Sequence, residues 1–160
     1  VARRAMGFDM RLVAKSGSRK PELARRYCLT YLDDAEFFSQ SDIIVLCCPN
    51  TPKTCHMINR HTLGMMKPSA VLINPSRGGL VDTGALCEAL RQGQIAGAAL
   101  DAYEEEPLLE SPLFGLENVV LTPHIGGLAD KQIHDVAVLS AENCAAVLSG
   151  HTDNLNMICR

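Results

Sequence analysis

The stretch Ala70-Val-Leu-Ile-Asn-Pro-Ser-Arg-Gly-Gly-Leu-Val-Asp82 joins an apolar run to a tight turn that carries one fixed positive charge. The run at 70–73 is typical of a strand buried in a parallel sheet, and the glycine pair at 78–79 ends it. In open α/β sheets, ligands bind just outside the carboxyl ends of the strands, where we expect Arg77 to lie. Because a guanidinium is permanently charged and forks onto carboxylates, Arg77 suits a substrate that carries an acid group.

Two further segments end a short apolar run in a chemically active side chain. Residues 97–107 read Gly-Ala-Ala-Leu-Asp-Ala-Tyr-Glu-Glu-Glu-Pro, and residues 119–127 read Val-Val-Leu-Thr-Pro-His-Ile-Gly-Gly. An Arg-Gly-Gly turn by itself is more often an ordinary surface turn, and a histidine at a strand end can simply be capped there. Three such segments together, with Arg77, Glu106 and His124, favour a doubly wound sheet, which gathers its catalytic groups at one edge.

The remaining apolar and polar runs alternate at the spacing of strands and helices. We expect strands at 10–14, 29–32, 43–48, 70–73, 95–100 and 119–121. We expect helices at 1–7, from Pro21, at 33–39, 59–66, 83–92 and 129–149. This alternation predicts an α/β fold, a doubly wound parallel sheet, in one domain at 1–150 with a tail at 151–160.

The composition narrows the class of protein. With 160 residues, 47% hydrophobic and 21% charged, the chain is typical of a globular domain. A net charge of −3 does not provide the positive charge that a nucleic-acid-binding surface needs. No apolar run approaches the roughly 20 residues that cross a bilayer. The seven cysteines form no CxxC pair, which favours free thiols in a reducing compartment. His56 and His61 have no metal-ligand partners at a useful spacing, so no metal site is expected, and a cytoplasmic location is the default expectation.

The three segments at 70–82, 97–107 and 119–127, which carry Arg77, Glu106 and His124, resemble in order and separation those of the D-2-hydroxyacid dehydrogenase family. From residue 1 to about residue 150 the chain is similar to the family's cofactor-binding domain, and within the family it resembles glyoxylate/hydroxypyruvate reductases. The resemblance implies a Rossmann-like NAD(P)-binding domain that lacks its first strand and its Gly-rich phosphate-binding turn. It also implies that the substrate domain is absent from this chain, so we expect the chain alone to be inactive.

The resemblance assigns roles in the reduction of a 2-oxo acid. Such a reaction needs a hydride donor, an acid for the carbonyl oxygen and a cation for the carboxylate. His124 would be the acid, Glu106 its carboxylate partner, and Arg77 the cation. A carboxylate that hydrogen-bonds the second ring nitrogen favours the imidazolium form of a histidine. Glu104 and Glu105 are expected to be solvated, because a run of three acids is usually an exposed face.

The turn at 15–20, Lys-Ser-Gly-Ser-Arg-Lys, bears on the choice of cofactor. An NAD-type site has an Asp or Glu after the second strand to bind the ribose 2′-hydroxyl, and that position falls at Ser16. No acid stands there to repel a 2′-phosphate, whereas Ser16, Ser18, Arg19 and Lys20 could bind one. The turn therefore favours NADP(H) over NAD(H). As a merely solvated basic turn, it would leave the cofactor undetermined.

Further cofactor contacts follow from the resemblance alone. Asp101 matches the position that contacts the nicotinamide carboxamide, and the loop at 48–54 matches a segment beside the adenine and its ribose. The glycines at 126–127 would let the backbone approach the cofactor closely. The expected cofactor-binding residues are Ser16, Arg19, Lys20, Cys48, Pro49, Thr54, Pro75, Ser76, Arg77, Asp101, His124, Gly126 and Gly127.

The expected function is an NADPH-dependent reductase of small 2-oxo acids such as glyoxylate or hydroxypyruvate, and the expected assembly is a homodimer. One alternative keeps the chemistry as an NAD-dependent dehydrogenase of another 2-hydroxy acid, such as 3-phosphoglycerate. Another is a dinucleotide-sensing transcriptional corepressor, because such proteins retain the same side chains. No nucleic acid or membrane is an expected partner.

Overall fold

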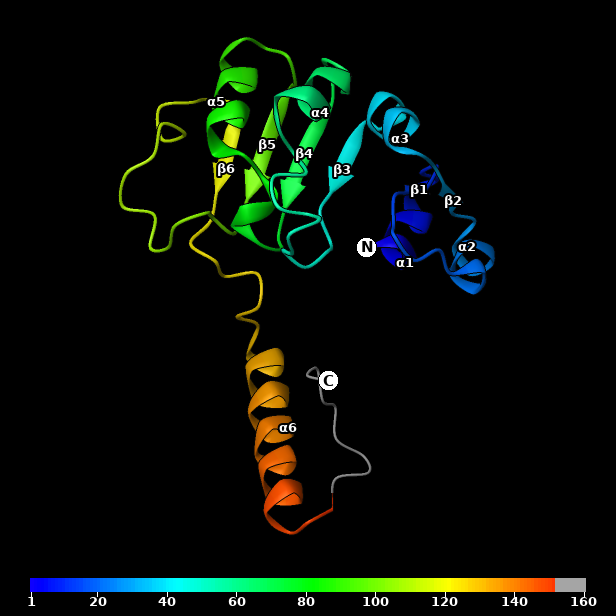
Figure 1. Ribbon diagram of the computed structural model, residues 1–160, viewed down its shortest axis with the longest axis vertical. Coiled ribbons are helices and arrows are strands. Elements are labelled where there is room, and N and C mark those ends of the chain that lie inside the picture. The colour runs from blue at the N-terminus through cyan, green and yellow to red at the C-terminus, as the bar shows by residue number, and fades with distance from the viewer. Residues whose placement is uncertain (152–160) are drawn as a thin grey trace. The chain divides into compact units, whose positions relative to one another are not determined.

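A four-stranded parallel sheet forms the centre of residues 1–123 in a computed structural model that describes residues 1–151 (Figure 1). Its strands lie side by side in chain order: β3 (Ile43–Val45), β4 (Val71–Asn74), β5 (Gly97–Leu100) and β6 (Val119–Leu121). Leu72 of β4 stands opposite Ile44 of β3 and Ala98 of β5. Because all the pairs are parallel, the carboxyl ends of the four strands meet at one edge of the sheet.

A separate two-stranded sheet comes earlier in the chain. It pairs β1 (Val13–Ala14) with β2 (Thr30–Tyr31), also in parallel. Among the described residues, no strand joins β1 to β3. The parallel α/β fold predicted from the sequence is confirmed, and its sheet is interrupted between the second and third strands of the chain.

The helices begin where the sequence supplies caps. Asp33 accepts a hydrogen bond from the backbone of Glu36 (2.9 Å), and Asp82 accepts one from Ala85 (2.9 Å). Asn59 and Thr62 form a reciprocal capping box. The helices are α1 (Ala2–Ala5), η1 (Met6–Phe8), α2 (Pro21–Tyr27), α3 (Asp34–Gln40), α4 (Arg60–Met65), η2 (Gly78–Leu80), α5 (Thr83–Arg91) and α6 (Asp130–Leu148).

The core of residues 1–123 lies where helices α3, α4 and α5 pack against the four-stranded sheet. Leu72 at the centre of the sheet is fully buried, as are Phe38 of α3, Leu63 of α4 and Leu86 of α5. The apolar run at 70–73 is therefore a buried parallel strand, as predicted. Burial of one such side chain contributes roughly 1.5–3 kcal/mol to folding.

Four strands are shorter than the sequence predicts: β2 and β5 each begin later than the expected ranges 29–32 and 95–100, and β1 and β3 differ most. The strand expected at 10–14 contains only Val13 and Ala14, and Met10 is 48% exposed. The strand expected at 43–48 ends at Val45, although the Leu46 amide still donates to the Ile73 carbonyl (2.9 Å). The apolar runs are longer than the hydrogen-bonded parts of β1 and β3, because an apolar side chain can still pack where the backbone no longer pairs with a neighbouring strand.

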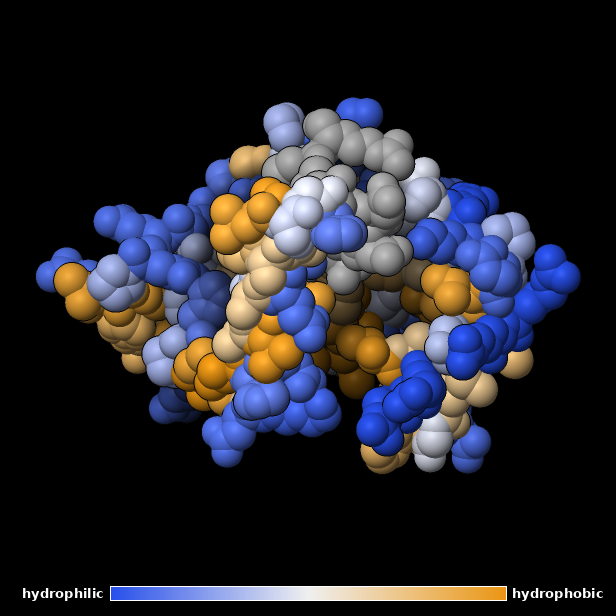
Figure 2. Space-filling view, turned by 90° about the horizontal axis from the view of Figure 1, so that it is seen from below, coloured by the Kyte–Doolittle hydropathy of each residue, from blue (hydrophilic) through white to orange (hydrophobic). Residues whose placement is uncertain are grey.

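The chain divides after Pro123 into two compact units, and the second begins at His124. Its main element is α6, which exposes Ile133, Val136, Leu139 and Leu148. Figure 2 shows apolar side chains at the molecular surface among polar ones.

Within residues 1–151, no helix combines the length and apolar character needed to cross a bilayer. The domain boundary expected at 150 stays a prediction, and the expected tail lies, from residue 152, outside the described residues.

Candidate functional site

The turn that carries Arg77 is organised by Asn74, the last residue of β4. Asn74 is only 1% exposed, and its side-chain Nδ2 donates to the Arg77 carbonyl (2.9 Å). Its Oδ1 accepts from the Ser76 amide (3.1 Å), and the Ser76 hydroxyl donates to the Leu46 carbonyl (2.7 Å). Arg77 itself is exposed, and its Nη1 donates to the Ser76 carbonyl (2.8 Å). The guanidinium is thus presented on a fixed turn.

Our sequence interpretation missed Asn74. A polar residue that closes an apolar strand is the signal that could have found it, because a buried amide must find hydrogen-bond partners. Here the partners are the backbone groups of the turn itself. Pro75 lies exposed at the start of that turn.

Gly78 brings the Arg77 turn into backbone contact with the loop that follows β5. A Cβ atom at Gly78 would lie 1.7 Å from the Tyr103 carbonyl carbon and 2.3 Å from the Glu104 amide nitrogen. Gly79 is also crowded, since a Cβ there would lie 2.3 Å from Nδ2 of Asn50. Gly78 is therefore required by close packing against backbone atoms, whereas a Cβ at Gly79 would meet only a side chain that can move.

The substitution Gly78→Ala is expected to lower the stability of the chain by about 3 kcal/mol, the upper end for overpacking. The added methyl would meet backbone atoms, which cannot rotate away as a flexible side chain can. Thermal unfolding measures the change, with Gly115→Ala as the control, because a Cβ at Gly115 would have nothing within 4 Å. Equal melting temperatures for the two variants would contradict the contact.

The loop after β5 holds Asp101 and Glu106 through neighbouring groups. The Thr122 hydroxyl donates to Asp101 Oδ1 (2.7 Å), and the Asp101 amide donates to the Asn74 carbonyl (3.0 Å). Glu106 Oε1 accepts from the Tyr103 amide (2.9 Å). The Tyr103 hydroxyl lies 2.8 Å from the Thr122 carbonyl oxygen, and burial raises the pKa of this phenol. These bonds fix two carboxylates beside the carboxyl ends of β5 and β6.

Glu104 is exposed, as the sequence predicts, but its carboxylate also makes two specific contacts that the sequence interpretation did not expect. Its Oε1 lies 2.7 Å from Nε2 of His56, and its Oε2 accepts from the Thr83 amide (3.0 Å). Burial pushes the pKa of Glu104 upward, but hydrogen bonds from Thr83 and the His56 contact outweigh it and lower the pKa below its ordinary value. Glu105 is likewise exposed, as expected.

The loop at 48–54 is held by its own side chains. The Thr54 hydroxyl donates to the Pro49 carbonyl (2.7 Å) and accepts from the Thr51 amide (2.8 Å). The Cys48 thiol lies 3.6 Å from the Met57 sulfur, and burial, followed by the neighbouring Cys47, raises its pKa. Thr54 therefore shapes the loop, while Pro49 stands exposed on it.

The basic turn after β1 is exposed throughout residues 16–20. The Ser16 hydroxyl donates to the Ser18 carbonyl (2.9 Å) and accepts from the Ser18 amide (3.2 Å). The Arg19 guanidinium carbon lies 6.0 Å from the centre of the Tyr31 ring, and the Lys20 amide donates to the Tyr31 hydroxyl (3.1 Å). Lys20 and Arg19 thus present cations on a turn anchored by Tyr31.

The residues expected at the end of the third active segment belong to the second unit. His124 and both glycines at 126–127 are exposed, and the His124 backbone has a positive φ of 53°. This left-handed conformation is uncommon for a residue with a side chain, and such residues cluster at functional sites. The hydrogen bonds described above join only residues of the first unit.

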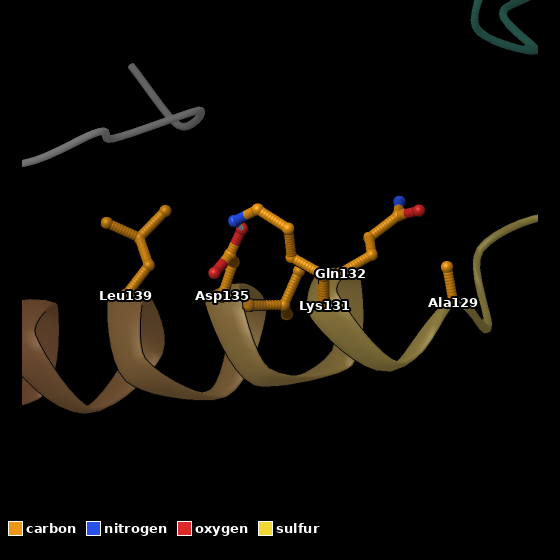
Figure 3. A pocket seen from close by; sticks show the side chains of 6 residues that line it. Ala129, Lys131, Gln132, Asp135 and Leu139 are labelled. Atoms are coloured by element: carbon orange, nitrogen blue, oxygen red, sulfur yellow. Dashed lines mark hydrogen bonds and ion pairs between the residues drawn. The ribbon is translucent and has the colours of Figure 1, made fainter.

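A shallow depression lies on α6, lined by Ala129, Lys131, Gln132, Asp135, Val136 and Leu139 (Figure 3). All of its residues come from one helix and the residue before it, and Lys131 and Asp135 form an ion pair across it (2.5 Å). None of the residues expected to act in catalysis or cofactor binding lies there. We therefore assign it no function.

The described cysteines are free, and Cys159 lies outside the described residues. Within residues 1–151, no group of three or more His, Cys, Asp or Glu side chains is arranged to hold a metal ion.

Comparison with known proteins supplies the family context for this arrangement. Residues 1–126 match the family model for the NAD-binding domain of D-isomer-specific 2-hydroxyacid dehydrogenases. A glyoxylate reductase of Thermococcus onnurineus is 47% identical over 150 residues, which are 94% of this chain and 45% of that protein. The chain thus spans about half the length of the curated relatives it matches.

Two solved structures share the fold. The NAD-complexed D-isomer-specific 2-hydroxyacid dehydrogenase of Lactobacillus delbrueckii ssp. bulgaricus has a TM-score of 0.85 and 32% identity, over 96% of this chain and 50% of that one. The NADPH-dependent glyoxylate/hydroxypyruvate reductase of Sinorhizobium meliloti, solved with NADP and malonate, has a TM-score of 0.86 and 31% identity, over 92% and 46%.

Proposed function

The chain belongs to the D-isomer-specific 2-hydroxyacid dehydrogenase family, and on this premise we propose that its protein reduces small 2-oxo acids of the glyoxylate and hydroxypyruvate type. The observation that carries the proposal is the 47% identity to a glyoxylate reductase across nearly the whole chain. The exposed cation Arg77 beside the carboxylate-bearing loop after β5 supports it independently.

We propose that Arg77, Glu106 and His124 divide the chemistry between them. Arg77 would bind the substrate carboxylate and polarise the carbonyl oxygen. His124 would hold the proton that this oxygen receives, and Glu106 would keep the imidazole charged and oriented. The reduced nicotinamide supplies the hydride for the carbonyl carbon, so that the 2-oxo acid becomes a 2-hydroxy acid.

We propose that the complete protein also contains a substrate domain and a Gly-rich phosphate-binding turn outside this chain. Support comes from the relatives, of which the chain covers 45% to 50%, and from the two-stranded sheet, which is not paired with the four-stranded sheet among the described residues. The domain at 1–150 would then be the cofactor-binding half of a cytoplasmic homodimer. Sedimentation equilibrium of the complete protein tests the dimer, and cell fractionation tests the location.

NADP(H) is the proposed cofactor, because the donor set after β1 fits a 2′-phosphate. Ser16 stands where an NAD-type site has an acid, and Arg19 and Lys20 are exposed cations on the same turn. The other proposed contacts are Cys48, Pro49, Thr54, Pro75, Ser76, Arg77, Asp101, His124, Gly126 and Gly127. Of the two solved relatives, one is described with NADP and the other with NAD, so the family alone does not decide the matter.

Replacing both Arg19 and Lys20 with alanine is expected to raise the Kd for NADPH about tenfold or more, while the Kd for NADH stays nearly unchanged. A hydrogen bond to a charged group contributes about 1.5–3 kcal/mol, and only NADPH carries the 2′-phosphate that these cations would contact. Fluorescence titration measures both constants. The control is Arg25→Ala, which removes an exposed cation from α2. Equal weakening of NADH and NADPH would remove the phosphate-binding role.

The proposed function is tested by the initial rate of NADPH and NADH oxidation by the complete protein with glyoxylate and with hydroxypyruvate. Rapid oxidation that prefers NADPH is the expected result. A preference for NADH would keep the chemistry and discard the proposed cofactor. Cofactor binding without turnover of these acids would direct the test to other 2-oxo acids and then to a dinucleotide-sensing role.

A further inference from the structure

Glu104 joins three segments that lie far apart in the sequence. Its two carboxylate oxygens contact His56, which follows β3, and the amide of Thr83, which begins α5. Glu104 itself belongs to the loop that follows β5, two residues before Glu106. We name this arrangement of Glu104, His56 and Thr83 the Glu104 clasp.

The clasp contacts the residues that follow Arg77 on its turn. The His56 amide donates to the Gly79 carbonyl (2.8 Å), so His56 holds the turn two residues after Arg77. Thr83 lies six residues after Arg77, where the turn has become α5. The Glu104 carboxylate thus bridges the segment alongside the turn and the helix beyond it.

One backbone hydrogen bond, from the Asp101 amide to the Asn74 carbonyl (3.0 Å), ties the start of the loop after β5 to the end of β4. Gly78 packs against the Tyr103 carbonyl and the Glu104 amide, and such packing resists compression but not separation. Three residues beyond Asp101, the Glu104 carboxylate supplies a further attraction, because its two oxygens contact His56 and Thr83 on the side of the Arg77 turn. The same loop holds Glu106, whose Oε1 accepts from the Tyr103 amide. A shift of residues 103–104 would therefore change the placement of Glu106 relative to Arg77.

The His56 backbone is a second, independent observation. Its φ of 48° lies in the left-handed region, which is unfavourable for a residue with a Cβ atom. Three contacts hold this conformation: the Gly79 carbonyl at its amide, the Asn59 side chain at its carbonyl (2.8 Å) and Glu104 at its ring. Strained backbone that persists in this way is held by its surroundings.

We propose that Glu104 is a positioning residue that sets the Arg77 turn against the loop carrying Glu106, and so fixes the two charged groups in their working geometry. The inference rests on the proposed function, because it assigns Glu104 a part in the same reaction. The side chains of His56 and Glu104 are 46% and 37% exposed, so their ion pair contributes little to folding stability. The same pair can still affect the reaction rate, because a displacement of about 1 Å in an active site can lower the rate 10²-fold.

The test compares Glu104→Ala and Glu104→Gln with Glu105→Ala in the complete protein. Glu105 is the matched control, because it is an exposed glutamate in the same run. Glu104→Ala is expected to lower kcat for glyoxylate about tenfold and to change the KM for the reduced cofactor less than twofold. Glu104→Gln keeps one acceptor oxygen for the Thr83 amide and places an NH2 group that can donate to Nε2 of a neutral His56, so it is expected to recover most of kcat. Glu105→Ala is expected to match the wild type.

A purely structural role would lower the melting temperature of Glu104→Ala while kcat per folded molecule stayed at the wild-type value, and that result would overturn the proposal. Hydrogen–deuterium exchange gives a readout that needs no turnover. Amides at 77–80 and 103–106 are expected to exchange faster in Glu104→Ala than in Glu105→Ala. If the wild type reduces no 2-oxo acid, the proposed function fails. The amide exchange rates then test by themselves whether Glu104 holds the two loops together. Unchanged exchange would overturn it.

Discussion

Replacement of Arg77 by alanine is expected to lower kcat/KM for glyoxylate by about 10³-fold in the complete protein. Loss of one preorganised group that stabilises a developing oxyanion costs roughly 10² to 10³ in rate. Arg77 would also bind the substrate carboxylate, and a fork of two N–H donors cannot be replaced by water without loss of orientation. Because the Arg77 side chain is exposed, the melting temperature should change little. Steady-state kinetics and thermal unfolding of the purified variant measure the two effects.

Arg77→Lys is the matched control, because it keeps the charge but loses the planar fork. We expect it to recover part of the lost activity and to remain well below the wild type. Full activity of Arg77→Ala would show that another cation binds the acid group. If the loss of activity were instead explained by a lower melting temperature and a smaller folded fraction, Arg77 would act by stabilising the fold. The Asn74 side chain holds the Arg77 carbonyl in place, so neither substitution removes the bond that shapes the turn.

The sequence predicts the fold well where the pattern is local. The strand at 119–121 is confirmed at both ends, and α2 begins at Pro21 as expected, because proline favours the first helical position. Strand ends were less predictable: β1 and β3 are shorter than their apolar runs. Pairing depends on a neighbouring strand, and the sequence of one strand does not say where its neighbour ends.

The site was predictable in its residue types but not in its supporting contacts. Arg77 and Asp101 follow neighbouring strands β4 and β5, as expected from the carboxyl-end rule for parallel sheets. Glu104 and Glu105 are identical side chains in one run, so composition cannot separate them. Only the tertiary fold brings His56, 48 residues earlier, within reach of one and not the other. The roles of all these residues stay predictions until the variants are measured.

Replacement of His124 by glutamine is the second large effect we expect, with kcat for glyoxylate falling about 10²- to 10⁴-fold. That range is the usual contribution of a positioned general acid or base, and glutamine cannot donate a proton to a developing alkoxide. Glutamine keeps a polar side chain of similar reach, so cofactor binding should weaken much less than kcat falls. Stopped-flow measurement of cofactor oxidation and a fluorescence titration separate the two.

The matched control is His61→Gln, because His61 is an exposed histidine in the first turn of α4 and has no proposed part in the reaction. It should leave kcat unchanged. If His124→Gln retains kcat within about threefold of the wild type, another group must protonate the carbonyl oxygen. The positive φ at His124 then becomes informative: a left-handed backbone at a residue without a catalytic task would need a structural cause. If His124→Gln instead loses turnover, a matching His124→Gly substitution removes the strain together with the imidazole. Increased stability with lost turnover would then assign the strained conformation to function.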